Sequence, residues 1–266
     1  MVVRNSPKKV EDALVIRHQQ ESEPLAEGEV GGSVTMSRAL AQSAHGLTLN
    51  EARVMMLATR CIDPRKSPYA YARDGYVKVR VTADEFAQMA EMAGGGGRTP
   101  PGAGEGLKAA CDKLFDRRAT WREGKKIIKL AWVWKATYHE GEGWAEVCFS
   151  PDMTTHLFML GSKFVRYRLE MARGLRSTYS VNLLRLLMTQ KDTGFLAITL
   201  DDFKHAMEVP VSYRYADIKR YAILPPIKEL GEKADLLVQF TEVKKGRSVN
   251  SLRFSFVPDP QGRLDV

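Results

Sequence analysis

The clearest pattern of apolar and polar positions lies in residues 196–256. A short apolar run at 196–198 precedes Thr199, whose hydroxyl can cap a helix with Asp202 at the third helical position. Phe203, Ala206 and Met207 then follow at helical spacing. This segment predicts a strand that leads directly into a short amphipathic helix.

A second helical pattern spans residues 214–224. Its predicted apolar side holds Ile218, Tyr221, Ala222 and Pro225. The other side holds Ala216, Lys219, Arg220 and Ile223. Two strand-like runs follow at 236–243 and 249–257, joined by the basic turn at 244–248. Two helices followed by a two-stranded wing predict a winged helix, whose second helix would enter the DNA major groove.

The same order of elements occurs earlier in the chain. Residues 79–86 (VRVTADEF) match residues 196–203 (LAITLDDF) position by position in type, and residues 121–132 repeat the later strand, basic turn and strand. An internal duplication indicates that both copies bury their apolar faces in the same way. We therefore predict an α+β protein made of two tandem winged-helix domains.

The remaining pattern predicts the domain limits. Residues 1–33 are polar and predict a disordered tail, residues 34–160 the N-terminal domain, residues 161–258 the C-terminal domain, and residues 259–266 a second tail. Gly161-Ser162 marks the predicted joint, and a predicted helix from Ser150 to Leu160 adjoins it. We expect this helix either to pack in the first core or to change its packing between assembly states.

Two segments conflict with regular helices. Residues 94–106 (GGGGRTPPGAGEG) predict a flexible insertion before a helix at 107–117, and they lack the Gly-Lys-Ser/Thr of a nucleotide-binding loop. Pro225-Pro226 lies inside the second helix of the C-terminal copy and predicts that this helix ends or kinks near Leu224.

Charge is distributed unevenly along the 266 residues. The net charge is +8, and residues 161–266 hold 18 Lys and Arg against 12 Asp and Glu. A basic half suggests a polyanionic partner, most often nucleic acid, although a solvated surface would have the same composition. Three separated cysteines, Cys61, Cys111 and Cys148, indicate reduced core residues rather than a disulfide or zinc framework. No apolar run is long enough for a membrane span, so we expect a cytoplasmic protein that has no membrane partner.

The candidate DNA-binding residues are basic or polar side chains in and around the two predicted motifs. In the C-terminal half they are Arg166, Arg168, Arg173, Arg176, Ser177, Ser212, Arg214, Tyr215, Lys219, Arg220, Lys244, Lys245, Arg247 and Asn250, and in the N-terminal half they are Arg117, Arg118, Arg122, Lys125 and Lys126. Between Lys219 and Arg220 the sequence does not choose a base-reading residue, since both lie away from the predicted apolar side.

Catalytic chemistry is not indicated. The five histidines are scattered, and acidic pairs such as Asp201-Asp202 stand at helix N-termini, where the helix dipole favours negative charge. Zinc-protease, nucleophile-elbow and nucleotide-loop motifs do not occur. We expect no enzyme activity, no metal and no cofactor.

The chain resembles a known family at several motifs. They are Phe164-x-x-Tyr167, residues 175–187 (LRSTYSVNLLRLL), Leu200-Asp-Asp-Phe203, residues 215–220 (YADIKR), residues 226–230 (PIKEL) and residues 244–247 (KKGR). These are similar to the replication-initiator proteins of iteron-bearing, theta-replicating bacterial plasmids. The resemblance covers about residues 37–257 and departs from the family at the Gly-rich insertion and at the doubled proline.

The resemblance implies a bacterial protein with two winged helices and two activities. As a monomer it would bind direct repeats (iterons) of the plasmid origin, and as a homodimer it would repress its own gene at an inverted repeat. The C-terminal domain would supply most base contacts, and the N-terminal domain would supply backbone contacts and much of the dimer interface. The host initiator protein, the replicative helicase and chaperones are the implied partners. A winged-helix transcriptional regulator without a replication role is the alternative, and a winged-helix protein used only for protein contacts is a third.

Overall fold

The computed structural model describes residues 32–60, 62, 72–73, 76–92, 99–158, 160 and 164–258. Residues 1–31 and 259–266 of the predicted tails, the predicted joint at Gly161-Ser162 and residues 94–98 of the Gly-rich insertion lie outside these residues. The N-terminal half contains β1 (Ser33–Ser37), α2 (Arg38–Ala41), α3 (Leu49–Arg60), β2 (Ala72–Arg73), β3 (Tyr76–Thr82), α4 (Ala83–Met89), α5 (Ala103–Leu114), β4 (Arg118–Glu123), β5 (Lys126–Ala131), β6 (Val133–His139), β7 (Trp144–Phe149) and α6 (Pro151–Thr154). The rest contains β8 (Phe164–Arg168), η2 (Leu169–Ala172), α7 (Thr178–Met188), β9 (Phe195–Thr199), α8 (Leu200–Ala206), α9 (Tyr215–Asp217), η3 (Ile218–Ile223), α10 (Leu224–Lys233), β10 (Leu236–Lys245) and β11 (Ser248–Pro258).

Two copies of one arrangement make up the protein. In the first, β7 lies between β3 and β6, and in the second, β11 lies between β9 and β10. Each sheet therefore joins the strand before the two helices to the hairpin after them, which is the topology of a winged helix. Thr82 and Thr199 cap the equivalent helices α4 and α8 by accepting a hydrogen bond from the backbone N–H three residues on. The predicted α+β class and the tandem duplication are confirmed.

The hairpin at residues 121–132 is not the wing of the first copy, as the repeated pattern had suggested. β4 and β5 pair only with each other among the described strands, in a separate two-stranded sheet. The first wing is instead β6–β7, because β7 is the strand that pairs with β3. Both hairpins alternate in the same way along the sequence, and only pairing with the distant strand β3 distinguishes them.

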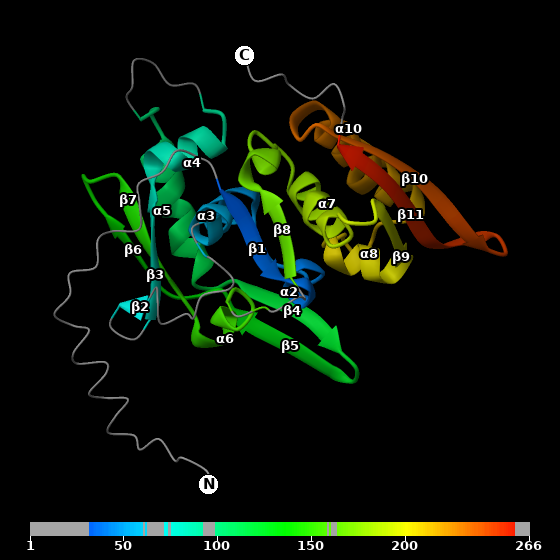
Figure 1. Ribbon diagram of the computed structural model, residues 1–266, viewed down its shortest axis with the longest axis horizontal. Coiled ribbons are helices and arrows are strands. Elements are labelled where there is room, and N and C mark those ends of the chain that lie inside the picture. The colour runs from blue at the N-terminus through cyan, green and yellow to red at the C-terminus, as the bar shows by residue number, and fades with distance from the viewer. Residues whose placement is uncertain are drawn as a thin grey trace, which may run out of the picture.

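One apolar core runs through both halves. The central helices α3 and α7 are buried along almost their whole length, and α7 contacts both α3 and α10. In Figure 1, β1 and β8 lie side by side near the centre, with the first winged helix to the left and the second to the right. Since β8 follows the predicted joint and pairs antiparallel with β1, the chain returns to its N-terminal half after residue 163.

Two helices differ from their predicted limits. α6 ends at Thr154 rather than Leu160, and Leu157 beyond it is fully buried in the common core. α5 begins at Ala103, inside the segment predicted to lack regular structure. Tight packing explains the early start, since a β-carbon at Gly106 would lie 3.0 Å from Cε1 of Phe86 on α4. Glycine lets the two helices approach closely enough to bury Ala103 and Leu107.

The helix that contains Pro225 and Pro226 does not end near Leu224. α9, η3 and α10 form one helical run from Tyr215 to Lys233, in which η3 is a π-helix. The prolines lie in the first turn of α10, where a missing N–H is tolerated, directly after the wider π-helical turns.

The π-helix also changes which side of this run faces the core. Ile223 is buried, whereas Tyr221 and Pro225 are exposed, so the predicted faces are wrong at these three positions; Pro226, for which no face was predicted, is buried. A π-helix has more residues per turn than the 3.6 assumed from the sequence, and the apolar side therefore shifts by about one residue after Ile218.

Candidate DNA-binding interface

The helical run from Tyr215 to Lys233 presents one exposed stripe. Ala216, Arg220, Tyr221, Leu224 and Lys228 are exposed along it at spacings of four, one, three and four residues. The run follows α8 through a loop in which Ser212 and Val211 are exposed, and Arg214 precedes its first turn with an exposed side chain. The arrangement is a helix-turn-helix whose second helix offers cationic and apolar side chains to a groove.

Lys219 and Arg220 have different surroundings. The Nζ atom of Lys219 donates to Oε1 of Glu242 on β10 at 2.8 Å and lies 5.6 Å from the ring centre of Phe240. The guanidinium of Arg220 remains on the exposed stripe, 5.2 Å from the ring centre of the neighbouring Tyr221. Arg220 is therefore the better placed of the two for a base edge.

Tyr215 faces the same carboxylate as Lys219. Burial and the adjacent Glu242 raise the pKa of the Tyr215 phenol, and hydrogen bonding from Lys219 helps to lower the pKa of Glu242. Lys219 thus connects the recognition helix to the wing, and the Tyr215 hydroxyl is buried rather than extending away from the protein.

The wing carries the densest positive charge of this site. Lys244, Lys245, Arg247 and Asn250 are exposed at or beside the turn between β10 and β11. Gly246 has φ 65° there, a conformation that glycine adopts without strain. Exposed lysine and arginine at a wing tip are suited to phosphate contacts, which position a protein on the duplex without reading sequence.

The basic cluster at residues 166–176 lies away from Arg220. Arg166 and Arg168 are exposed on β8, and Arg168 is 3.5 Å from Glu170. Arg173 and Arg176 are exposed beside the start of α7, where the backbone N–H of Arg176 donates to Glu229. Glu229 stands nine residues after Arg220 on the recognition helix, about 14 Å along its axis at helical rise. The hydroxyl of Ser177 is occupied as the N-cap of α7.

The equivalent surface of the first winged helix has the opposite character. α5 exposes Glu105 and Asp112 beside Lys113 and the partly exposed Lys108, and the tip of its wing carries Glu142 and Glu140, which pairs with Lys108. Because phosphates repel carboxylates, α5 is poorly suited to enter a groove.

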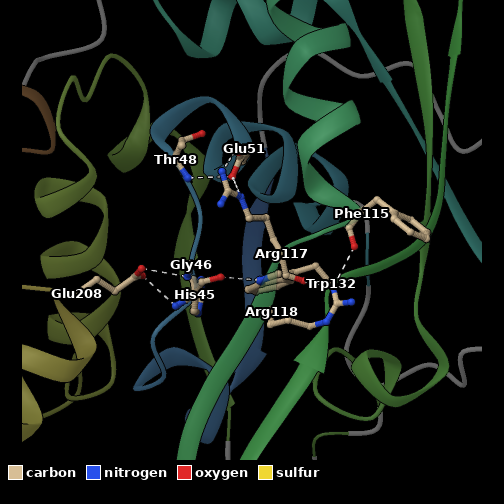
Figure 2. Close-up of polar contacts among 9 residues, drawn as sticks. All are labelled: His45, Gly46, Thr48, Glu51, Phe115, Arg117, Arg118, Trp132 and Glu208. Atoms are coloured by element: carbon tan, nitrogen blue, oxygen red, sulfur yellow. Dashed lines mark hydrogen bonds and ion pairs between the residues drawn. The ribbon is translucent and has the colours of Figure 1, made fainter.

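Candidates from the first half fall into two groups. Figure 2 shows Arg117 directed at Glu51: its Nε and Nη2 donate to the carboxylate at 2.7 and 3.0 Å, and Glu51 itself is completely buried. Arg118 is exposed, and its guanidinium donates to the carbonyls of Phe115 and Arg117. Arg122, Lys125 and Lys126 are exposed at the turn of the separate β4–β5 hairpin.

Sequence reasoning missed four members of the exposed stripe. Ala216, Tyr221 and Leu224 were not selected, since the first is small and the others are apolar, and Lys228 was not selected although it is basic. Tyr221 and Leu224 are 44% and 47% exposed, which is unusual for large apolar side chains in the middle of a helix. Apolar contacts of this kind can read thymine methyl groups. The doubled proline was the available signal, because it requires a departure from α-helical geometry.

Comparison with known families identifies the family to which the chain belongs. Residues 33–188 match the model described as "Initiator Replication protein, WH1", and residues 199–256 match the model described as "Initiator Rep protein, WH2". The chain belongs to the initiator replication protein family. The resemblance seen in the sequence is therefore correct, and the two matched segments correspond to the two winged helices.

Similar proteins agree with this membership. The crystal structure of the Pi initiator protein in complex with iteron DNA superposes with a TM-score of 0.72 at 21% identity, covering 88% of this chain and 100% of that chain. An uncharacterized 27.6 kDa protein of Escherichia coli is 22% identical over 233 residues, which is 82% of this chain and 93% of that protein. The likeness to the Pi structure shows the shared fold.

The described residues also bear on membrane and metal sites. None of the helices in the described segments is long and apolar enough to cross a membrane. Within the same segments, His, Cys, Asp and Glu side chains form no cluster of three or more that could hold a metal ion. Cys111 and Cys148 are buried free thiols, as the sequence predicted, and Cys61 lies outside the described residues.

Proposed function

We propose that this protein initiates plasmid replication by binding direct repeats of double-stranded DNA at the origin. The recognition helix α9–η3–α10 would enter the major groove, with Arg220 reading a base edge. The wing lysines and arginine would contact phosphates. Family membership supports the initiator role, and the DNA-bound relative supports repeat recognition by this fold.

The observation that carries the proposal is the contrast between the two winged helices. The second exposes Arg220, Lys244, Lys245 and Arg247, and the first has four acidic residues, Glu105, Asp112, Glu140 and Glu142, against two lysines, Lys108 and Lys113, at the corresponding helix and wing tip. One fold used twice with opposite charge favours a division of labour. The second copy would read DNA, and the first would serve mainly for contacts with phosphates elsewhere or with protein.

Dimerisation through the first half is the second part of the proposal. Trp134 and Tyr76 are exposed on β6 and β3 and stack with their ring centres 5.9 Å apart. Exposed stacked aromatic side chains are typical of protein interfaces. We propose that a homodimer formed there represses the initiator gene, and that the host initiator protein, the replicative helicase and chaperones are partners. We further propose that the protein has no enzyme activity and acts in the bacterial cytoplasm.

We also propose that the division between the domains lies after α7, in residues 189–198, rather than at Gly161-Ser162. Pairing of β8 with β1 supports this, because it binds residues 164–168 to the N-terminal half. The two matched segments also separate between residues 188 and 199.

A footprint on the replicon that encodes the chain would identify the repeat, and fluorescence anisotropy on that duplex would then test binding. The log of affinity should fall linearly with log salt, by about 0.9 for each phosphate contacted. A scrambled duplex should bind much more weakly. Equal affinity for both, or a flat salt response, would reject specific duplex recognition.

Replication is tested separately from binding. A plasmid that carries this gene and its repeats should transform a host that cannot use another origin, and deletion of the repeats should abolish transformants. If the protein binds the repeats but plasmids without them still replicate, the chain is a winged-helix regulator instead.

A further inference from the structure

Helices α4 and α8 end in the same way. Ala90 and Met207 close them by donating to the carbonyls of Phe86 and Phe203, at 3.0 and 2.9 Å. Two residues further on, Met92 and Val209 donate to Ala87 and Lys204, at 3.0 and 2.9 Å. This hydrogen-bond pattern places the residue between each pair in the left-handed region, where glycine is usual.

Both of these positions are occupied by glutamate. Glu91 has φ 50° and Glu208 has φ 56°. A side chain at positive φ is strained compared with glycine, because its β-carbon crowds the backbone. Because two duplicated positions both keep the same strained residue, the carboxylate itself needs an explanation.

The Glu208 carboxylate crosses from the second winged helix to the N-terminal half. Its Oε1 accepts from the backbone N–H of His45 at 2.9 Å, and its Oε2 accepts from that of Gly46 at 3.0 Å. Figure 2 shows the side chain spanning the space between the two halves to reach this loop. Two backbone donors for one carboxylate make a charge-assisted contact with a fixed direction.

The Glu91 carboxylate reaches from the first winged helix to the second. Its Oε2 lies 2.6 Å from Nζ of Lys233, at the end of α10 in the second winged helix. The same carboxylate packs on Gly174, where any β-carbon would collide with it, and the N–H of Gly174 donates to Met89 at 3.1 Å. The end of α4 is therefore held against both the second winged helix and the loop before α7.

We propose that Glu91 and Glu208 are reciprocal positioning residues that fix the orientation of the two winged helices relative to each other. Each comes from the turn after the first helix of one motif and binds the opposite half. α4 lies at the upper left of Figure 1 and α8 to the right of centre at mid-height, so the two contacts lie at different places along the boundary. The inference does not depend on which DNA the chain binds.

The small stabilising energy of these carboxylate contacts indicates that they orient the two halves rather than hold them together. The Glu91–Lys233 pair is partly exposed, with side chains 31% and 25% accessible, and such pairs contribute little to stability. Cohesion comes from the apolar core that runs through both halves. An apolar contact has little directional preference, whereas carboxylate contacts at its two ends select one arrangement.

The test measures a distance between the halves in the full-length protein without DNA. Spin labels are attached at Asp112→Cys on α5 and Gln239→Cys on β10, both exposed positions, with Cys61, Cys111 and Cys148 replaced by alanine throughout. The parent should give one narrow distance distribution. Glu91→Gln combined with Glu208→Gln keeps the shape of both side chains and removes both charges, and it should broaden or shift the distribution.

Asp235→Asn is the matched control. Asp235 is the third described non-glycine residue at positive φ, at 49°, and among the described residues its carboxylate makes no hydrogen bond or ion pair. This control should keep the narrow distribution. The proposal is overturned if the double glutamine variant also keeps it.

A second double variant tests whether misfolding, rather than loss of the carboxylates, broadens the distance. Glu91→Gly with Glu208→Gly relieves both strained conformations, so this protein should melt no lower than the parent and still show the broadened distance. A narrow distribution in this variant also overturns the proposal. Hydrogen exchange adds a local readout: the amides of His45 and Gly46 should exchange about tenfold faster in Glu208→Gln but not in Asp235→Asn. Unchanged exchange at both amides would show that Glu208 is not a positioning residue.

Discussion

Lys219 on the recognition helix and Glu242 on the wing are joined by a 2.8 Å ion pair. The pair connects the two parts of the motif that are expected to contact DNA, and it leaves Lys219 43% exposed and Glu242 22% exposed. Arg220 has no carboxylate partner among the described residues and extends from the same turn. Two adjacent basic residues thus have separate roles, which binding experiments can distinguish.

Arg220→Ala should weaken binding to the protected repeat by about 1–3 kcal/mol, and the loss should be concentrated at one base pair. Lys219→Ala should weaken all duplexes to a similar and smaller extent, because it releases the wing without removing a base contact. Competition with single-base variants of the repeat measures both. If the two variants show the same loss on every duplex, including a scrambled one, Arg220 contacts phosphate.

Lys245→Ala at the wing tip should lower the slope of log affinity against log salt by about 1 and weaken specific and nonspecific DNA alike. The matched control is Lys125→Ala at the turn of the β4–β5 hairpin. A reduced slope for Lys125→Ala as well would extend the interface to the first half. An unchanged slope for Lys245→Ala would show that the wing does not contact DNA.

Local chemistry made much of the fold predictable from the sequence. Thr82 and Thr199 cap equivalent helices, and the apolar residues that follow each cap are buried as their spacing requires. The basic turn at residues 244–247 is the tip of a wing in the structure. These features depend on residues within a few positions of each other, so periodicity and capping rules suffice.

The features that sequence reasoning missed depend on distant partners. Arg117 looked like a cation available to phosphate, but the buried Glu51 on α3 engages it from 66 residues away. The first wing could not be told from the β4–β5 hairpin without the pairing of β7 to β3. Inside the recognition helix, the π-helix moved Tyr221 to the surface, and no spacing rule based on 3.6 residues per turn anticipates that shift.

Arg117→Ala should destabilise the protein by about 2–3 kcal/mol, because it leaves the buried Glu51 carboxylate without its cation. Burial alone would raise the pKa of Glu51, but hydrogen bonds from Arg117 and Thr48 outweigh burial and lower it. Urea unfolding near neutral pH measures the loss. Arg118→Ala, which removes only exposed bonds to two carbonyls, should stay within about 0.5 kcal/mol of the parent.

Adding Glu51→Gln to Arg117→Ala tests whether the unpaired Glu51 charge causes the loss of stability. If the unpaired charge is responsible, the neutral amide should recover part of the lost stability. A double variant less stable than Arg117→Ala would show that packing of the arginine side chain, rather than its charge, accounts for the effect.

His45 should make the stability of the protein depend on pH. It is buried, its Nε2 lies 2.9 Å from the carbonyl oxygen of Leu40, and its ring packs on Trp132 with centres 4.7 Å apart. Burial and the nearby Arg185 charge hold its pKa well below the ordinary value of 6.5. The unfolded chain therefore binds a proton that the folded chain excludes, and stability is lost as pH falls below the unfolded value toward the folded one.

The measurement compares the free energy of unfolding at about pH 7.5 and about pH 5, where a buried neutral histidine costs about 1.4 kcal/mol for each pH unit below its unfolded pKa. His45→Gln keeps a side-chain donor for Leu40 and cannot titrate, so its loss between the two pH values should be smaller than that of the parent. His156 also has a lowered pKa, chiefly through burial, and will leave part of the dependence in place. His205→Gln changes an exposed histidine and should match the parent. A His45→Gln variant with the full pH dependence of the parent would show that His45 is not the group that excludes the proton.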